Sequence, residues 1–246
     1  KPSRNTDLFS LAVLLFYMFM LNHPLEGRRE ARIKCMDIHA MNMLYGTDPL
    51  FIFDPDNKDN RPLAGYQDNA LIFWDLYPQQ LRELFTTSFT VGLGQPNRRI
   101  TEGKWMETFA NLMSGIMLCP NCGSEVFYDA QKEESGAAHT CWGCQKAVTV
   151  PPKIVIGKST VLLMSNTKLY RHHIEGNYDM ETKVGEVVQN PANLKLWGMK
   201  NLSGENWTYI KADGTQVPVP PGRSAAIAVD TKIDFGQKTG EFHGGA

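Results

Sequence analysis

The chain has 246 residues, and its 25 lysine and arginine residues nearly balance its 26 aspartate and glutamate residues. This balance excludes a global basic field for nucleic acid, and the absence of a polybasic run argues against an anionic membrane surface as partner. The length allows one to three domains. The five cysteines do not form the framework of a small secreted disulfide protein, so we expect a reducing, cytoplasmic compartment.

An apolar run occupies residues 8–21, close to the first residue of the chain. A helix that crosses a membrane needs about 18–20 apolar residues, and a signal peptide needs a basic leader, whereas Asp7 directly precedes this run. The run therefore predicts a buried core helix, capped by Asn5 or Thr6 and ended by Pro24. A helix that is apolar all round must be covered on all sides.

Helices are predicted for most of residues 1–117. Residues 47–69 are rich in Asp, Asn, Pro and Gly, which indicates a long loop of the kind that is often functional or held by local packing. Residues 70–93 return to a helical pattern with one apolar stripe, formed by Leu81, Leu84, Phe85 and Phe89. A further helix is predicted for residues 101–117, with Thr101 as its cap.

Residues 118–150 contain two Cys-x2-Cys pairs, which is the strongest chemical signal in the sequence. The pairs are separated by eighteen residues and comprise Cys119, Cys122, Cys141 and Cys144. Four thiolates at this spacing can close a tetrahedral shell around one Zn²⁺, which is typical of a structural zinc ribbon. Two disulfides, four free thiols or an iron–sulfur centre are the alternatives, and His139 could compete as a ligand. A module this short would take most of its folding energy from the metal.

Residues 151–246 change in composition to short Val, Ile, Leu and Thr runs between turn signals, which predicts an all-β sandwich. Asp213-Gly214 indicates a hairpin turn. His172 and His173 fall in a strand-like run, so we expect them to face opposite ways, one buried and one exposed. Cys35 is expected to be a small buried side chain. No Ser-His-Asp set, phosphate-binding loop or His-Glu-x-x-His helix is present in the sequence.

Two motifs in the first segment resemble the large lobe of protein kinases. The first is an Asp, two residues, Ser-Leu-Ala-Val, an apolar turn, and Pro-Leu-x-Gly, which here spans Asp7 to Gly27. The second is "QPNRRIT" followed by "EGKW", in which Arg99 takes the family's arginine position and Ile100 replaces the usual proline. The chain looks like bacterial Hanks-type serine/threonine kinases that carry a zinc ribbon and a β-rich tail.

The resemblance implies supporting roles for two residues. Asp7 would hydrogen-bond the backbone of the catalytic loop, and Arg99 would pair with the glutamate of the Ala-Pro-Glu motif. The Gly-rich loop, the phosphate-binding lysine, the catalytic Asp and the magnesium site precede this helix in the family and are not in this sequence. Since the chain also begins with Lys1 rather than Met, we expect a fragment that neither binds ATP and Mg²⁺ nor transfers phosphate alone, and whose exposed flank is apolar.

The third segment resembles a forkhead-associated domain more loosely. The strand and Asn-containing turn "LWGMKNLSGENWTYI" is followed by a strand pair that contains Ile227, Asp230, Ile233, Phe235 and Gly236. The phosphothreonine-reading loops have no clear match, because Glu186 stands where the family has an arginine. A degenerate sandwich scaffold is therefore expected.

These features predict a multidomain α+β protein. Its parts would be a kinase large-lobe remnant at 1–117, a zinc ribbon at 118–150 and a forkhead-associated-like β-sandwich at 151–246. The expected function is the C-terminal portion of a serine/threonine protein kinase with regulatory or docking modules. The alternative is a non-enzymatic adaptor built on a kinase remnant. A protein partner or substrate is expected, with neither nucleic acid nor membrane. The stretch from Cys119 to Cys144 has Lys132 as its only basic residue, which argues against nucleic acid.

Overall fold

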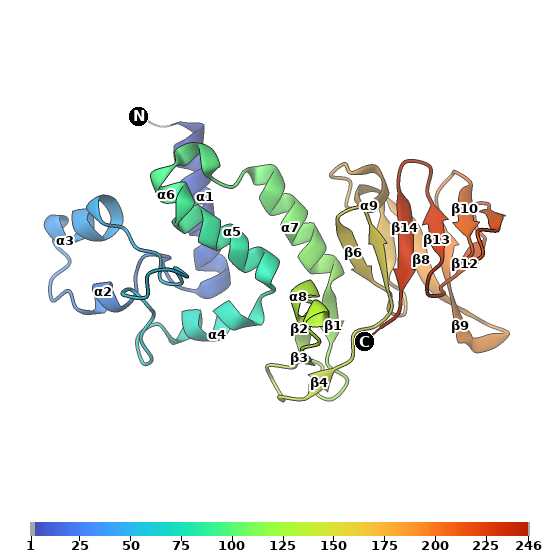
Figure 1. The fold of residues 1–246 in the computed structure, drawn as a ribbon, viewed down its shortest axis with the longest axis horizontal. Helices are drawn as coiled ribbons and strands as arrows, with labels where there is room; N and C mark the ends of the chain where they lie inside the picture. The colour runs from blue at the N-terminus through green and yellow to red at the C-terminus, as the bar shows by residue number, and fades with distance from the viewer. Residues whose placement is uncertain (1–2, 246) are drawn as a thin grey trace. The chain divides into compact units, whose positions relative to one another are not determined.

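The computed structural model describes residues 3–245 and has a mixed α+β fold. It divides into two compact units: unit 1 contains the residues up to Ala110 together with Asp129–Gln131, and unit 2 contains the rest. Figure 1 shows the helices of unit 1 and the sheets of unit 2. None of the helices found within residues 3–245 has the length and apolar character needed to cross a lipid bilayer.

Unit 1 is helical, as the sequence predicts. Its elements are α1 (Arg4–Met20), α2 (Arg28–Ala31), α3 (Ile38–Asn42), the π-helical turn η1 (Met43–Thr47), α4 (Asp68–Leu76), α5 (Gln79–Phe89), α6 (Val91–Gly94), the 3-10 turn η2 (Pro96–Arg98) and the first part of α7 (Glu102–Ser114). All four residues of the predicted stripe on α5 are buried.

Helix α1 differs from the prediction at its cap and in its cover. Ser3, not Asn5 or Thr6, is the N-cap, because its extended backbone lets its hydroxyl oxygen accept from the Thr6 amide at 3.3 Å. Within unit 1 the helix is covered on one side only. Phe16 is fully buried on the covered side, while Leu14 and Met18 are 58% and 66% exposed.

The core of unit 1 is a cluster of aromatic rings around Phe16. This ring lies edge-to-face with those of Phe51, Phe85 and Phe89, at centroid distances of 5.1–5.7 Å. Phe51 belongs to the predicted long loop, which has no helix or strand between residues 48 and 67. The buried aromatic side chains of this loop anchor it together with hydrogen bonds such as that from the Ile52 amide to the Pro24 carbonyl, at 2.9 Å.

Helix α7 ends at Ser114, three residues before its predicted end. Residues Ile116–Leu118 form strand β1, which pairs antiparallel with β2 (Glu125–Phe127). The pairing begins where the Tyr128 amide donates to the Gly115 carbonyl at 2.8 Å. The helical pattern of the sequence was therefore wrong here, because strand pairing across the first cysteine pair outweighs local propensity.

The remaining elements of unit 2 form a small ribbon and a sandwich. The ribbon adds α8 (Ala130–Glu134), whose first residues belong to unit 1, β3 (His139–Thr140) and β4 (Ala147–Val148). The sandwich contains β5 (Lys153–Ile156), β6 (Ser159–Leu162), β7 (Lys168–Tyr170), α9 (Arg171–Glu175), β8 (Lys183–Asn190), β9 (Asn193–Asn201), β10 (Trp207–Ile210), β11 (Gln216–Val219), β12 (Ser224–Ala226), β13 (Lys232–Asp234) and β14 (Thr239–His243).

Two sheets of the described chain enclose the main core of unit 2. One has the strand order β11-β10-β13-β14-β5-β6 and the other β12-β9-β8-β7, with antiparallel pairing throughout. Ile154 and Trp207 from the first sheet pack in one cluster with Val187 and Met199 from the second. The predicted β-sandwich and its Asp213-Gly214 hairpin are both present, and Gly214 has the positive φ of 83° that such a turn requires.

Candidate metal centre

Each Cys-x2-Cys pair lies in a tight turn that follows a short strand. In the first turn the Gly123 amide donates to the Cys119 carbonyl at 2.9 Å, and Gly123 has a φ of 75°. In the second turn the Gln145 amide donates to the Cys141 carbonyl at 2.8 Å. The same local geometry therefore occurs twice, and strand pairs β1–β2 and β3–β4 present the two turns.

The four sulfur atoms converge on one point. All four Sγ atoms lie within 4.8 Å of one another. The Cys119–Cys144 sulfurs are 3.6 Å apart and the Cys122–Cys141 sulfurs 3.4 Å apart. A disulfide needs about 2.05 Å, whereas tetrahedral zinc with Zn–S bonds of about 2.3 Å puts sulfurs roughly 3.8 Å apart. The geometry fits a closed zinc site with four cysteine ligands and not two disulfides.

The surroundings of Cys119 and Cys122 lower the pKa of their thiols, whereas those of Cys141 raise it. The Ser124 hydroxyl and amide lower the pKa of Cys122 to about 6. Backbone amides of Asn121 and Cys122 lower the pKa of Cys119, while burial raises that of Cys141 to about 11. Amides directed at sulfur stabilise thiolate, which is the form that binds zinc.

The centre is anchored in a small core of its own. Cys119 and Cys141 are buried together with Met117, Val126, Val148, Val150 and the β6 residue Leu162. Cys122 is exposed. The four-cysteine cluster thus connects the surface of the ribbon to an edge strand of the sandwich. Zinc bound to all four thiolates would have no open position for substrate, so its role would be structural.

A buried polar cluster also connects the ribbon to the sandwich. Lys153 on β5 forms an ion pair with Glu133 on α8, and the Tyr128 hydroxyl donates to the same carboxylate at 2.6 Å. Burial alone would raise the pKa of Glu133, but the hydrogen bonds from Lys153 and Tyr128 outweigh it and lower the pKa. His139 is buried and stacks on Tyr128 at 5.6 Å. His139 is therefore part of this cluster, and it is not among the converging metal ligands.

Asp7 and Arg99, the two residues singled out by the kinase resemblance, lie near the N-terminus of α1. The Arg99 guanidinium donates to the Asn5 carbonyl at 2.5 Å and to the Gly92 carbonyl at 2.9 Å. It also lies 5.1 Å from the centre of the Phe9 ring. The Asp7 side chain is exposed in the first turn of α1.

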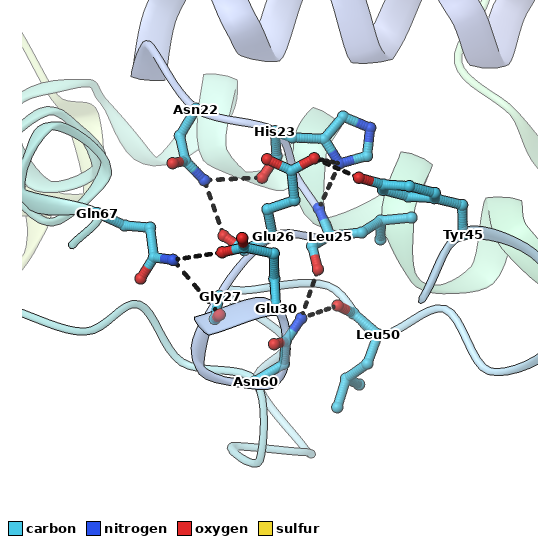
Figure 2. A network of polar contacts seen from close by, with 10 residues as sticks. All are labelled: Asn22, His23, Leu25, Glu26, Gly27, Glu30, Tyr45, Leu50, Asn60 and Gln67. Carbon is cyan, nitrogen blue, oxygen red and sulfur yellow. Dashed lines mark hydrogen bonds and ion pairs between the residues drawn. The ribbon is translucent and has the colours of Figure 1, made fainter. Parts of the chain in front are cut away.

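A second polar network fixes the turn that follows α1 (Figure 2). The buried Asn60 side chain donates to the carbonyls of Leu25 and Leu50, at 2.8 and 2.6 Å. The Tyr45 hydroxyl donates to Glu26 at 2.5 Å. A Cβ at Gly27 would lie 2.0 Å from the Asn60 carbonyl oxygen, so only glycine fits there. The long loop thus holds the segment in which the kinase-like motif ends.

The two adjacent histidines lie in helix α9 rather than in a strand, which corrects the prediction. His173 is buried, and its Nδ1 accepts from the Tyr170 amide at 2.9 Å while Nε2 lies 3.0 Å from Ser114 Oγ. Burial, with the neighbouring His172, lowers the pKa of His173 to about 3. Nδ1 is an acceptor, so Nε2 carries the proton, and His173 cannot act as a base toward Ser114 in this tautomer. The prediction for Cys35 was also wrong, because its side chain is exposed.

One end of the sandwich carries a cavity of about 600 Å³ that sequence reasoning did not find. Apolar side chains such as Phe235 and Ile174 line it together with Arg171, Lys183 and Asn206. The Arg171 guanidinium forms an ion pair with the Glu175 carboxylate, which also lines the cavity, at 3.2 Å. The β9–β10 loop at this cavity is held by the buried Asn201, whose side chain binds the carbonyls of Glu205 and Val219, at 2.8 and 2.9 Å.

Comparison with known proteins gives no relative from which a role could be transferred. No family model matches this sequence, and neither the curated proteins nor the solved structures gave a match.

Proposed function

We propose that the chain is the C-terminal portion of a serine/threonine protein kinase, in which the zinc ribbon and the sandwich dock a protein. Phosphoryl transfer would belong to the longer protein, since the catalytic and ATP-binding elements are not in this sequence. The family assignment rests on the two motifs quoted above and on the contacts that follow.

The observation that carries the proposal is the contact of Arg99, in the second motif, with the start of the first. The Arg99 guanidinium lies 5.1 Å from the centre of the Phe9 ring, inside the first motif, and binds the chain two residues before that motif begins. Arg99 and Asn5 are 94 residues apart in sequence, yet the guanidinium of one binds the backbone carbonyl of the other. An arginine in a solvated turn would not make this contact. The contact is expected of an arginine that stabilises the N-terminus of a central helix, and Asp7 lies in the first turn of this helix.

The exposed apolar face of α1 supports the same proposal. Leu14, Tyr17, Met18 and Leu21 follow the i, i+3, i+4, i+7 pattern of one helix face, and all four are exposed. Exposed contiguous apolar surface of this kind marks an interaction site. In the proposed kinase, the preceding part of the large lobe would cover this face.

Expression of a longer form tests the proposal. The coding sequence that precedes Lys1 is added, and transfer of radiolabelled phosphate from Mg²⁺-ATP is measured for the longer and the present chain. We expect transfer by the longer chain only. Arg99→Ala in the longer chain should lower transfer, whereas Arg98→Ala, a matched exposed neighbour, should not.

The alternative function, a non-enzymatic adaptor, is the other outcome of this experiment. A start codon directly before Lys1, or a longer chain with intact zinc and no phosphate transfer, would remove the kinase activity and leave a zinc-dependent binding protein. In that case the apolar face of α1 would need a different partner.

A further inference from the structure

Trp142 is the exposed tryptophan of this chain. All five tryptophans lie within the described residues, and Trp142 is 54% exposed while the others are buried or partly buried. It lies between Cys141 and Gly143, inside the second metal-binding turn. A large aromatic side chain at this position adds nothing to the coordination shell, and burying it would be favourable.

The indole is held in place rather than free to rotate. Its Nε1 donates to the Glu125 carbonyl at 3.0 Å, and Gln145 Nε2 donates to the Trp142 carbonyl at 2.9 Å. Glu125 pairs across the β1–β2 ladder with Leu118, which is 62% exposed. We call Leu118, Glu125 and Trp142 the ribbon face. It consists of two exposed apolar side chains and one exposed carboxylate.

The charge of the ribbon face is negative. Four thiolates around one Zn²⁺ carry a formal charge of about −2, and Glu125 adds one more. Lys146, which follows the second turn, donates from its Nζ to Asn121 Oδ1 of the first turn at 2.6 Å. A cation at the ribbon face would be attracted by the Glu125 carboxylate and by the negative face of the indole ring.

We propose that the ribbon face binds a protein segment that carries an arginine or lysine next to an apolar side chain. The apolar side chain would pack on Leu118 and the indole, and the cation would pair with Glu125. A fixed tryptophan with little conformational entropy to lose is the kind of anchor that dominates protein interfaces. Nucleic acid could stack on an exposed indole, but its phosphates would be repelled by the zinc thiolates and Glu125.

This inference rests on the docking half of the proposed function and names the chemistry of the partner. Its test needs neither ATP nor upstream sequence. The peptide titration can therefore fail while phosphate transfer succeeds, and the reverse also holds.

The experiment uses the zinc-loaded chain labelled with ¹⁵N. Short peptides with one Arg and one Leu at varied separation, in a Gly-Ser background, are added to about 1 mM, where weak contacts are visible. A matched set replaces Arg by Glu, and an oligothymidine of similar length is the third probe. The Trp142 indole signal is assigned with Trp142→Phe. Zinc content is measured for every variant, so that unfolding is not mistaken for lost binding.

We expect the Arg peptides to shift the Trp142 indole and the Leu118 and Glu125 amides, and the Glu peptides to shift none of them. Glu125→Lys should weaken binding about tenfold, as loss of one charge contact does. Glu181→Lys, the same reversal at an exposed site of the sandwich, should not. The proposal is overturned if no Arg peptide shifts the indole, if the Glu peptides bind equally, if Glu125→Lys binds as well as the native chain, or if only the oligothymidine binds.

Discussion

The ion pair between Lys153 and Glu133 predicts a large loss of stability when it is broken from one side. The Lys153 and Glu133 side chains are only 11% and 22% exposed. Lys153→Met would leave the carboxylate in this site without its cationic partner, while the Tyr128 hydroxyl would still donate to it. Breaking a buried pair costs about 3–5 kcal/mol, and the partial exposure of Glu133 puts our expectation at about 3 kcal/mol.

The double variant Lys153→Met with Glu133→Leu separates the charge from the packing. Replacing both members of a buried pair by apolar groups of similar size is often nearly neutral, so we expect a total cost below about 1 kcal/mol. The two positions would then be coupled by about 2 kcal/mol or more. Lys232→Met supplies the matched control. Its pair with Glu241 spans two strands at 2.9 Å with side chains 45% and 40% exposed, so its loss should cost less than about 1 kcal/mol.

The assay is calorimetric unfolding of the zinc-loaded chain, because two compact units need not unfold in one transition. The transition to follow is the one that zinc removal shifts. The lowered pKa of Glu133 also sets the direction in which the stability changes with pH. The pair stabilises the fold at pH values above the ordinary range of a glutamate, and this contribution is lost as the pH falls through the folded pKa. The reasoning fails if Lys153→Met costs no more than Lys232→Met, or if the double variant is as unstable as the single one.

Three further outcomes follow from the structure. Cys141→Ser should abolish binding of one zinc per chain and unfold the ribbon, because structural zinc contributes about 10 kcal/mol or more to folding. Cys35→Ser should keep the zinc, and metal analysis with near-UV circular dichroism distinguishes the two variants. The pKa of His173 is about 3 in the folded chain and about 6.5 in the unfolded one. The free energy of unfolding of unit 2 should therefore fall by about 1.4 kcal/mol per pH unit as the pH falls from about 6.5 toward 3. In the His173→Asn variant, measured at constant zinc, this pH dependence should be flatter. Gly27→Ala should destabilise unit 1 by about 2–3 kcal/mol through the clash with Asn60, and Gly46→Ala, with open space around it, should cost less than about 1 kcal/mol.

The sequence predicted those features that depend on local spacing. The Cys-x2-Cys pairs, the apolar stripe of α5 and the Asp213-Gly214 turn each depend on residues a few positions apart, so periodicity and turn chemistry were enough. The convergence of the two cysteine pairs was also predicted, because four thiolates at that spacing are typical of tetrahedral coordination around one zinc ion.

The features that the sequence could not give are contacts between distant segments. Nothing local indicates that Lys153 meets Glu133, or that Arg99 reaches the backbone of Asn5. The two histidines form part of a helix because the Tyr170 amide binds His173 and Gly176 ends the turn in a left-handed conformation. A strand-like composition could not show that these contacts favour a helical turn over a strand. Ser3 became the cap for a similar reason, since several polar residues at a helix start are equally suitable by type.

The position of the metal ligands decides which experiments can separate folding from binding. Cys141 lies in the core that includes Leu162 of edge strand β6, while Trp142, the next residue, faces solvent. Removing the metal would therefore loosen the edge of the sandwich and release the indole at the same time. Zinc dependence of partner binding is expected under any role for unit 2 and cannot by itself locate the surface. Only substitutions that keep the zinc, such as Glu125→Lys, change the ribbon face while the core that supports it stays intact.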